Sequence, residues 1–473
     1  MGVATRTAGT SARVGRSQTG GVSKGFRREL GGLGLTLMAL GGIMGSGIFL
    51  GSGLVIQRAG PAALLVFALA ALAMFVEVGA LVEMASADPV PGSFLVYAQR
   101  VLGPAPVFVT GWVYWFSSVL TMSSEVTAAA LFMRLWLPTV PIWIWSLLYS
   151  AGIVGVNFLS VGGLGRIESV MALVKAAALL GFAALGLAWV LGWVRGPLPG
   201  PRSWAGGGPF WPHGVVGAAP SLLLALFAYA GTGVLGMAAA EVRSPAQSIP
   251  RAGRAATVTV TALYLSGIFF VLALQPWYRV PTTQSPFVAA LQAVGWPVLA
   301  SVMNVALLCA VLSTMNAALY ANVRVLYSLA RQGHAPRALS RLDRRGQPSR
   351  AIWTSAGLLL LATALAYILP HKAYAYLITA TGVQAMFIWW VVLQTQLRYR
   401  PYLLRRGHPL PVRMAGYPWT SWFGMAVVGV ALAASPLAHG ELVGVVVGFG
   451  GLAAAYLVWR LWGVAATSTD RTV

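Results

Sequence analysis

Three ionisable side chains, Glu77, Glu125 and Lys175, lie deepest within the long apolar runs of the sequence. A charge in the interior of a membrane is costly, so each of these residues is a candidate functional residue. Their carboxyl and ammonium groups can carry protons, or they can form permanent structural contacts. All five histidines fall in the connections between apolar runs, which argues against a histidine proton relay inside a membrane.

Two clusters of glycine interrupt apolar runs at separate places in the chain. Residues 41–53 contain six glycines, and residues 227–236 read Phe-Ala-Tyr-Ala-Gly-Thr-Gly-Val-Leu-Gly. Each glycine weakens a helix by about 1 kcal/mol relative to alanine. A broken membrane helix is tolerated where its freed N–H and C=O groups line a cavity, and two such breaks are typical of the binding site of a secondary transporter. The alternative is close helix–helix packing through small residues.

The composition is that of a membrane protein. Of the 473 residues, 58% are hydrophobic and 9% are charged, and the mean hydropathy is +0.76. These values predict an all-α polytopic membrane protein rather than a soluble domain with one core. The single cysteine, Cys309, excludes a disulfide framework and a cysteine-based metal site.

About twenty apolar residues cross the hydrocarbon core of a bilayer as a helix. On this basis the sequence predicts twelve spans. Their ranges are 33–57, 62–85, 105–136, 141–160, 167–193, 217–243, 254–275, 297–328, 352–369, 373–397, 419–436 and 442–462. Residues 1–30 are rich in Ser, Thr, Gly and Arg without an apolar core, which predicts a disordered cytoplasmic tail rather than a cleaved signal peptide. Residues 464–473 are predicted to form a second cytoplasmic tail.

Lysine and arginine gather on alternate sides of the predicted spans. The N-terminal tail and the connections after spans 8 and 10 are strongly basic, with Arg6, Arg13, Arg16, Lys24, Arg27, Arg28, Arg331, Arg337, Arg341, Arg344, Arg345, Arg350, Arg398, Arg400, Arg405, Arg406 and Arg413. The opposite connections hold only Arg58, Arg134, Arg195, Arg202, Arg279 and Lys372. Because cytoplasmic loops are enriched in basic residues, an even number of spans places both termini in the cytoplasm. The same rule accounts for the net charge of +22, so no nucleic-acid partner is expected.

Short motifs along the chain have the order and spacing found in a family of transporters. They are Gly45-Ser46-Gly47-Ile48-Phe49-Leu50-Gly51-Ser52-Gly53, Ala59-Gly60-Pro61, Glu83-Met84, Pro91-Gly92-Ser93-Phe94, Tyr114-Trp115, Glu125, Ala172-Leu173-Val174-Lys175, Ala239-Ala240-Glu241, Ser244-Pro245, Ile249-Pro250, Pro276-Trp277, Ser285-Pro286-Phe287, Asn316, Arg324 and Gly333-His334-Ala335-Pro336. With them the chain resembles the amino acid–polyamine–organocation superfamily. Within it, the chain is similar to the bacterial permeases for aromatic and other neutral amino acids and GABA. The resemblance runs from about Gly31 to span 10 and is weaker beyond.

The resemblance implies a fold of two five-helix repeats that are inverted in the membrane. Spans 1–5, at about 31–193, would form the first repeat, and spans 6–10, at about 217–397, the second. Together they would make a transport core at 31–397, followed by two further helices at 398–463. The resemblance also implies that substrate is held at the broken middles of spans 1 and 6, where the two glycine clusters independently predict breaks.

An amino acid offers a carboxylate and an ammonium group to such a site. The positive end of a half-helix favours the carboxylate, so the N–H groups at Ser46 and Gly47 are expected to bind it. Unwound carbonyls at 227–231 are expected to accept from the ammonium group. In related permeases the residue matching Gly233 is usually glutamate, so the glycine departs from their pattern and is expected to enlarge the pocket. The predicted substrate-binding residues are Ile43, Gly45, Ser46, Gly47, Phe227, Ala228, Ala230, Gly231 and Gly233.

The resemblance makes Lys175 the most informative ionisable residue. Related sodium-coupled folds place neutral oxygens around a cation at the matching position, and a lysine ammonium group there can replace the sodium ion. Burial favours the neutral form of lysine, so Lys175 is expected to couple transport to protons. The alternative is a permanently charged structural lysine. Glu125 is either a second proton-coupling site or a structural hydrogen-bonding partner, and cytoplasmic gate contacts are expected from Glu83, Glu241 and Arg324.

Together these features predict a secondary active transporter of the inner (plasma) membrane that imports amino acids by proton symport and alternating access. Its partners would be a small-molecule amino acid, protons and membrane lipid, without a cofactor or a metal. Two alternatives remain: an amino acid exchanger with the same fold, and a nutrient sensor that binds without transport. No predicted span offers a His-rich metal cluster or a Ser/His/Asp set, so an enzyme is not expected.

Overall fold

The computed structural model of the chain describes residues 31–90, 92–157, 161–194, 209–343, 347–368, 372–438 and 440–469. The predicted N-terminal tail, residues 1–30, lies outside this part. The regular elements in the described part are helices, which agrees with the predicted all-α class. Its last helix continues to Thr469, beyond the predicted end of span 12 at residue 462.

The helices follow one another along the chain with short connections. The longer ones are α1 (Gly32–Ile43), α3 (Ala63–Ala87), α5 (Pro104–Met133), α6 (Ile142–Asn157), α7 (Val161–Val190), α11 (Pro245–Leu274), α13 (Pro297–Arg331), α14 (Ser349–Ile368), α15 (Ala373–Arg405), α16 (Trp419–Ala434) and α17 (Leu442–Thr469). The shorter ones are η1 (Gly47–Gly51), α2 (Ser52–Ala59), η2 (Gly60–Ala62), α4 (Phe94–Leu102), α8 (Gly214–Ala218), α9 (Ser221–Ala228), α10 (Gly233–Met237), η4 (Ala238–Glu241), η5 (Trp277–Arg279), α12 (Pro286–Ala293), η6 (Arg337–Ser340) and η7 (Ser435–Leu437).

Nine helical segments in the described residues are long and apolar enough to cross a membrane. One of them, Gly47–Ala87, joins the second part of predicted span 1 to span 2, and eight others match predicted spans. The helix at predicted span 4, α6, has 16 residues, and α14 at predicted span 9 borders residues outside the described part. The chain is therefore an all-helical, multi-pass membrane protein.

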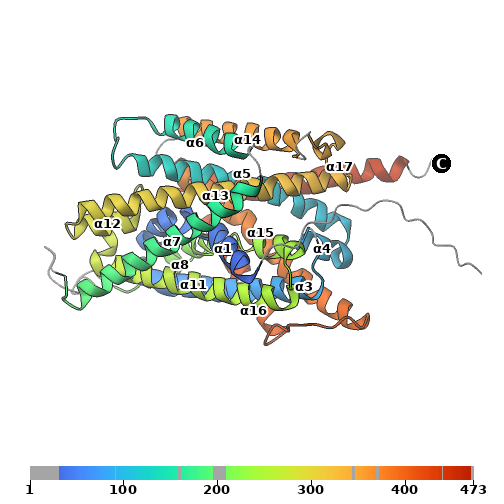
Figure 1. Cartoon of the computed structure of the whole chain (residues 1–473), viewed down its shortest axis with the longest axis horizontal. Coiled ribbons are helices and arrows are strands. Elements are labelled where there is room, and N and C mark those ends of the chain that lie inside the picture. The colour runs from blue at the N-terminus through green and yellow to red at the C-terminus, as the bar shows by residue number, and fades with distance from the viewer. Residues whose placement is uncertain are drawn as a thin grey trace, which may run out of the picture.

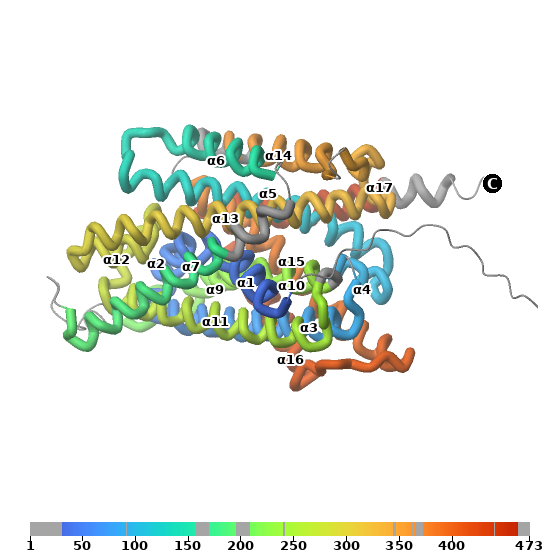
Figure 2. The backbone as a smooth tube through the Cα atoms, in the orientation of Figure 1, coloured from blue at the N-terminus to red at the C-terminus, as the bar shows by residue number. Residues whose placement is uncertain are grey.

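The interrupted segments lie in the middle of the helix bundle (Figure 1). α1 contacts α7, α11 and α13, and α9 contacts α3 and α15. α6 and α14 pack together at one edge of the molecule against α5, whereas α16 packs on α3 and α15 at the opposite edge (Figures 1 and 2). This arrangement surrounds the interrupted segments with long helices, so a site between them is shielded from lipid.

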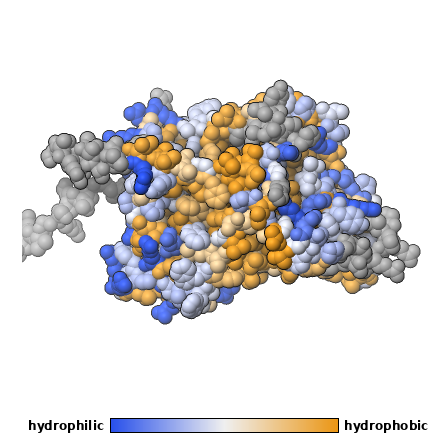
Figure 3. Space-filling model, turned by 180° about the vertical axis from the view of Figure 1, so that it is seen from behind, coloured by the Kyte–Doolittle hydropathy of each residue, from blue (hydrophilic) through white to orange (hydrophobic). Residues whose placement is uncertain are grey.

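The surface shows a central apolar zone. Hydrophobic residues gather across the middle of the face in Figure 3, and hydrophilic residues gather towards the two ends. Large apolar side chains such as Leu180, Leu361 and Leu457 are more than half exposed. Such exposure is expected of side chains that contact lipid rather than water.

Candidate functional site

The first predicted break lies between α1 and η1. The α-helix ends at Ile43, and Met44 has φ −81° and ψ 88°, which is not helical. The chain resumes at Gly47 as a π-helical turn before α2 begins at Ser52. A single π-helical turn is frequent at functional sites. The structure thus interrupts span 1 within the glycine cluster, where the sequence predicts it.

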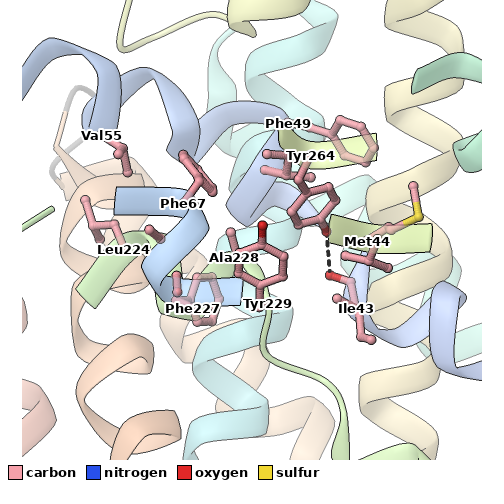
Figure 4. Close-up of a cluster of buried hydrophobic side chains, with 14 of the residues drawn as sticks. Ile43, Met44, Phe49, Val55, Phe67, Leu224, Phe227, Ala228, Tyr229 and Tyr264 are labelled. Atoms are coloured by element: carbon pink, nitrogen blue, oxygen red, sulfur yellow. Dashed lines mark hydrogen bonds between the residues drawn. The ribbon is translucent and has the colours of Figure 1, made fainter. Parts of the chain in front are cut away.

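Side chains from four other helices hold the backbone of this break. Lys175 Nζ in α7 donates to the Gly41 carbonyl at 2.7 Å. The hydroxyl groups of Thr314, Tyr264 and Tyr374 donate to carbonyls of the break: Met44 at 3.0 Å, Ile43 at 3.2 Å and Ser46 at 2.8 Å, respectively. The Tyr264 contact is drawn in Figure 4. These four carbonyl groups of the break are therefore satisfied by the protein itself.

Glu125 in α5 occupies the donor groups of Ser46. The Ser46 backbone N–H lies 3.0 and 2.9 Å from the two carboxylate oxygens, and its hydroxyl lies 3.0 Å from Oε1. A Cβ at Gly45 would lie 2.5 Å from Glu125 Oε1, so only glycine leaves room for this carboxylate. Of the two predicted roles of Glu125, this geometry supports the structural hydrogen-bonding partner.

The second predicted break lies between α9 and α10. The helix ends at Ala228, and Gly231 has φ +103°, a conformation that side-chain-bearing residues rarely adopt. Among the described residues, none donates a hydrogen bond to the carbonyl of Tyr229 or Ala230. The hydroxyl groups of Tyr229 and Thr232 are buried and also have no partner there. Polar groups of this break therefore lack hydrogen-bond partners in the described structure, whereas carbonyl groups of the first break have them.

The two breaks pack against each other backbone to backbone. A Cβ added at Gly47 would lie 2.7 Å from the Ala228 Cα, and one at Gly231 would lie 2.3 Å from the Gly42 carbonyl oxygen. The alternative of helix packing through small residues is thus part of the same feature, because the glycines bring the two interrupted segments together.

A cavity of about 120 Å³ lies between the breaks. Eight of the nine predicted substrate-binding residues line it: Ile43, Gly45, Gly47, Phe227, Ala228, Ala230, Gly231 and Gly233. Ser46 is fully buried beside Glu125 instead. Further walls come from α5, α13 and α15, including Ser117, Thr121, Ala318 and Trp389.

Glu77 and Thr232 were absent from the predicted site and line the same cavity. Glu77 is 2% exposed, and its carboxyl lies beside the Thr232 hydroxyl. The two groups do not meet in hydrogen-bond geometry, and Glu77 Oε2 has no hydrogen-bond partner among the described residues. The sequence signal for Glu77 was its position deep in an apolar run. Nothing in the sequence indicates that α3 lies beside Thr232.

Comparison with known proteins shows the family of the chain. The amino acid permease family profile matches residues 34–469. The uncharacterized amino acid permease YtnA of Bacillus subtilis (strain 168) is 36% identical over 88% of this chain and 90% of its own length. The gamma-aminobutyric acid permease of the same organism is 32% identical over 92% and 94%, and the aromatic amino acid transport protein AroP of Escherichia coli (strain K12) is 33% identical over 86% and 89%. The chain belongs to the amino acid permease family.

This permease is accordingly a membrane transport protein rather than an enzyme. The match begins within α1 and ends at the last residue of α17, so it covers both breaks and the cavity between them. It confirms the family that the sequence motifs predict.

At the far end of α3, the permease has a second polar cluster, centred on Glu83. Gln396 Nε2 donates to Glu83 Oε1 at 2.9 Å, and the Met414 backbone N–H donates to Oε2 at 2.6 Å. Arg400 Nη1 lies 3.4 Å from the same oxygen. Glu83 therefore ties α3 to α15 and to the segment before α16, through partners that the sequence did not identify.

The other two predicted gate residues are on η4 and α13. The Arg324 guanidinium stacks over the Tyr320 ring, 3.7 Å from its centroid, on α13. Glu241 ends η4, and its side chain lies outside the described part of the chain. The grouping of Glu83, Glu241 and Arg324 as one gate stays a prediction.

Proposed function

We propose that this permease imports amino acids across the inner (plasma) membrane by alternating access, driven by proton symport. The observation that carries the proposal is the cavity enclosed by two interrupted helices, with backbone groups of both breaks in its wall. Membrane transporters bind substrate at discontinuous helices of this kind. The relatives named as GABA and aromatic amino acid permeases support amino acids as the substrate class.

The substrate carboxylate would bind at Gly45 and Gly47. Both residues line the cavity, Gly45 just before η1 and Gly47 as its first residue, whereas the Ser46 N–H is occupied by Glu125. The substrate ammonium group would bind the open carbonyls of Tyr229 and Ala230. Phe227, which lines the cavity and is 6% exposed, would pack on the substrate side chain.

The wider architecture that we propose has twelve spans, with both termini in the cytoplasm. Spans 1–5 and 6–10 would form two inverted repeats, each beginning with an interrupted helix. The basic connections on alternate sides support this orientation. The inverted arrangement is supported by the position of each break near the start of its half.

Lys175 would couple the transport cycle to protons. It is fully buried, and its ammonium group contacts both the Gly41 carbonyl and, at 3.0 Å, the Thr314 hydroxyl. A charged donor forms stronger hydrogen bonds than a neutral one, so protonation would tighten the hold of α7 and α13 on the first break. Loss of the proton would loosen α1 and favour release of substrate.

Purified permease in proteoliposomes tests this function. Counterflow against the twenty common amino acids identifies the substrates, and uptake is then measured with and without an inward proton gradient. We expect substrate to accumulate with the gradient and independently of sodium. Accumulation only against an internal counter-substrate would identify an exchanger, and binding without any transport would identify a sensor.

A further inference from the structure

Glu77 is the carboxyl group in the cavity that the protein leaves unsatisfied. It is almost completely buried, and its Oε2 has no hydrogen-bond partner among the described residues. The described ion pairs of the chain do not include it. An unpaired buried carboxyl is costly, and a ligand that supplies a donor or a cation to it removes that cost.

The other cavity carboxyl, Glu125, is already in use. It accepts three hydrogen bonds from Ser46, and Lys175 lies near enough to interact with it electrostatically. Glu77 and Glu125 are the only acidic side chains among the described lining residues, and no lysine or arginine is among them. Glu77 is therefore the lining group that remains for a cation brought by a ligand.

The position of Glu77 separates it from the proposed carboxylate site. Its carboxyl lies beside Thr232, at the α10 end of the second break. Gly47 packs on Ala228, at the α9 end of the same break. A substrate whose carboxylate binds at Gly47 reaches Glu77 only with an amine that its carbon chain carries away from that carboxylate.

We propose that Glu77, with the Thr232 hydroxyl beside it, binds a distal amine of the substrate and so selects amino acids that carry one. This proposal rests on the proposed function. An ammonium group has three donors, and the Glu77 carboxyl and the Thr232 hydroxyl can accept from two of them, which leaves the carbonyl of Ala230 to the ammonium group beside the substrate carboxylate. Gly233 keeps this end of the cavity open, because an added Cβ there would meet only Met237 Cε at 3.9 Å.

The test compares substrates that differ only in the distal amine. Ornithine is compared with norvaline, and lysine with norleucine, as competitors in counterflow by the wild-type permease and by Glu77→Gln. We expect the wild type to prefer the amine-bearing member of each pair by at least ~10-fold, equivalent to ~1.4 kcal/mol. In Glu77→Gln the preference should be lost while norvaline is still exchanged.

Glu441→Gln is the matched control, because Glu441 is a buried carboxyl outside the cavity that pairs with Arg58 at 2.5 Å and accepts from Thr379 at 2.7 Å. It should keep the wild-type preference. Failure of every amino acid to exchange would refute the proposed function itself. If the wild type exchanges norvaline and ornithine equally well, only the role of Glu77 is refuted. This measurement uses the wild type alone, so it does not depend on the folding of a variant.

A proton-carrying role for Glu77 gives a different result. In that case Glu77→Gln would abolish gradient-driven uptake of norvaline and ornithine alike and would leave their relative affinities unchanged. That outcome would also overturn the proposal.

Discussion

The two helix breaks face the same cavity, but their polar groups are satisfied in different ways. In the first break, the carbonyl groups of Gly41, Ile43, Met44 and Ser46 accept hydrogen bonds from lysine, threonine and tyrosine side chains of α7, α11, α13 and α15. In the second break, the hydroxyl groups of Tyr229 and Thr232 have no partner within the described residues. We call the first, whose carbonyl groups are bound by side chains of the protein, the held break. We call the second, whose two hydroxyl groups lack such partners in the described structure, the open break.

This difference assigns different tasks to the two breaks. A buried polar group without a partner costs about 1–3 kcal/mol, and a ligand that supplies the partner recovers that cost on binding. The second break therefore gains most from a bound substrate. The first break keeps its shape without substrate, and Lys175 is the one cationic donor among the four described side chains that hold its carbonyls.

The contact between the breaks is the feature whose loss we expect to have the largest effect. In Gly47→Val, the new side chain would begin 2.7 Å from the Ala228 Cα and would push the two segments apart. Because a displacement of about 1 Å at a site can cost 10²-fold, we expect uptake and counterflow to fall by at least ~100-fold. Uptake is measured in proteoliposomes at equal protein content.

The matched control for this change is Gly181→Val on α7. Gly181 is exposed, and a Cβ there would meet nothing within 4 Å. It should transport like the wild type. Normal counterflow by well-folded Gly47→Val would show that the breaks need not touch.

Lys175→Ala tests whether the first break also changes conformation during proton-coupled transport. We expect accumulation driven by the proton gradient to be abolished, because the ammonium group that holds Gly41 is gone. Exchange of labelled for unlabelled substrate should survive, since it needs no net proton transfer. The control is Lys372→Ala at the exposed start of α15, which should keep gradient-driven uptake.

Retained accumulation in Lys175→Ala, or a requirement of the wild type for sodium, would contradict the coupling role. In that case Lys175 would be a structural lysine, and the exchanger would be the better description of the permease.

The sequence predicted the two breaks because glycine acts locally on the helix that contains it. It also predicted most of the cavity wall that the two breaks themselves contribute, since residues next to a break share its position. It could not predict that Glu125 binds Ser46, because the two residues are 79 positions apart and nothing local joins them. For the same reason the sequence could not predict the hydrogen bonds of Tyr264 and Tyr374 to the first break, because both tyrosines lie far along the chain from it.

The connection between predicted spans 1 and 2 is also signalled locally. The sequence predicts it at Ala59-Gly60-Pro61, and there α2 ends at Ala59 and α3 begins at Ala63. Gly60 has φ +60°, a conformation that glycine adopts without steric cost, so the α-helix is interrupted at this residue.

A pair of tyrosine variants compares the held break with the open one directly. Tyr374→Phe removes a 2.8 Å hydrogen bond to the Ser46 carbonyl and should lower the free energy of unfolding by about 1 kcal/mol. Tyr229→Phe removes a hydroxyl group that has no partner in the described structure, so stability without substrate should not fall. Thermal unfolding of the purified variants measures both. Equal losses would show that the two breaks are held alike.

The smallest effect is expected from Gly233→Ala, which adds one methyl group to the open break. The new Cβ would meet only Met237 Cε, at 3.9 Å, so neither folding nor the contact between the breaks should change. Because Gly233 lines the cavity, the methyl group takes space from the substrate alone. Counterflow of tryptophan should therefore fall by a few-fold while that of alanine stays near wild type. Gly181→Ala, on the exposed face of α7, should change neither. An equal loss for both substrates in Gly233→Ala would mean that this position controls the movement of α10 rather than the size of the cavity.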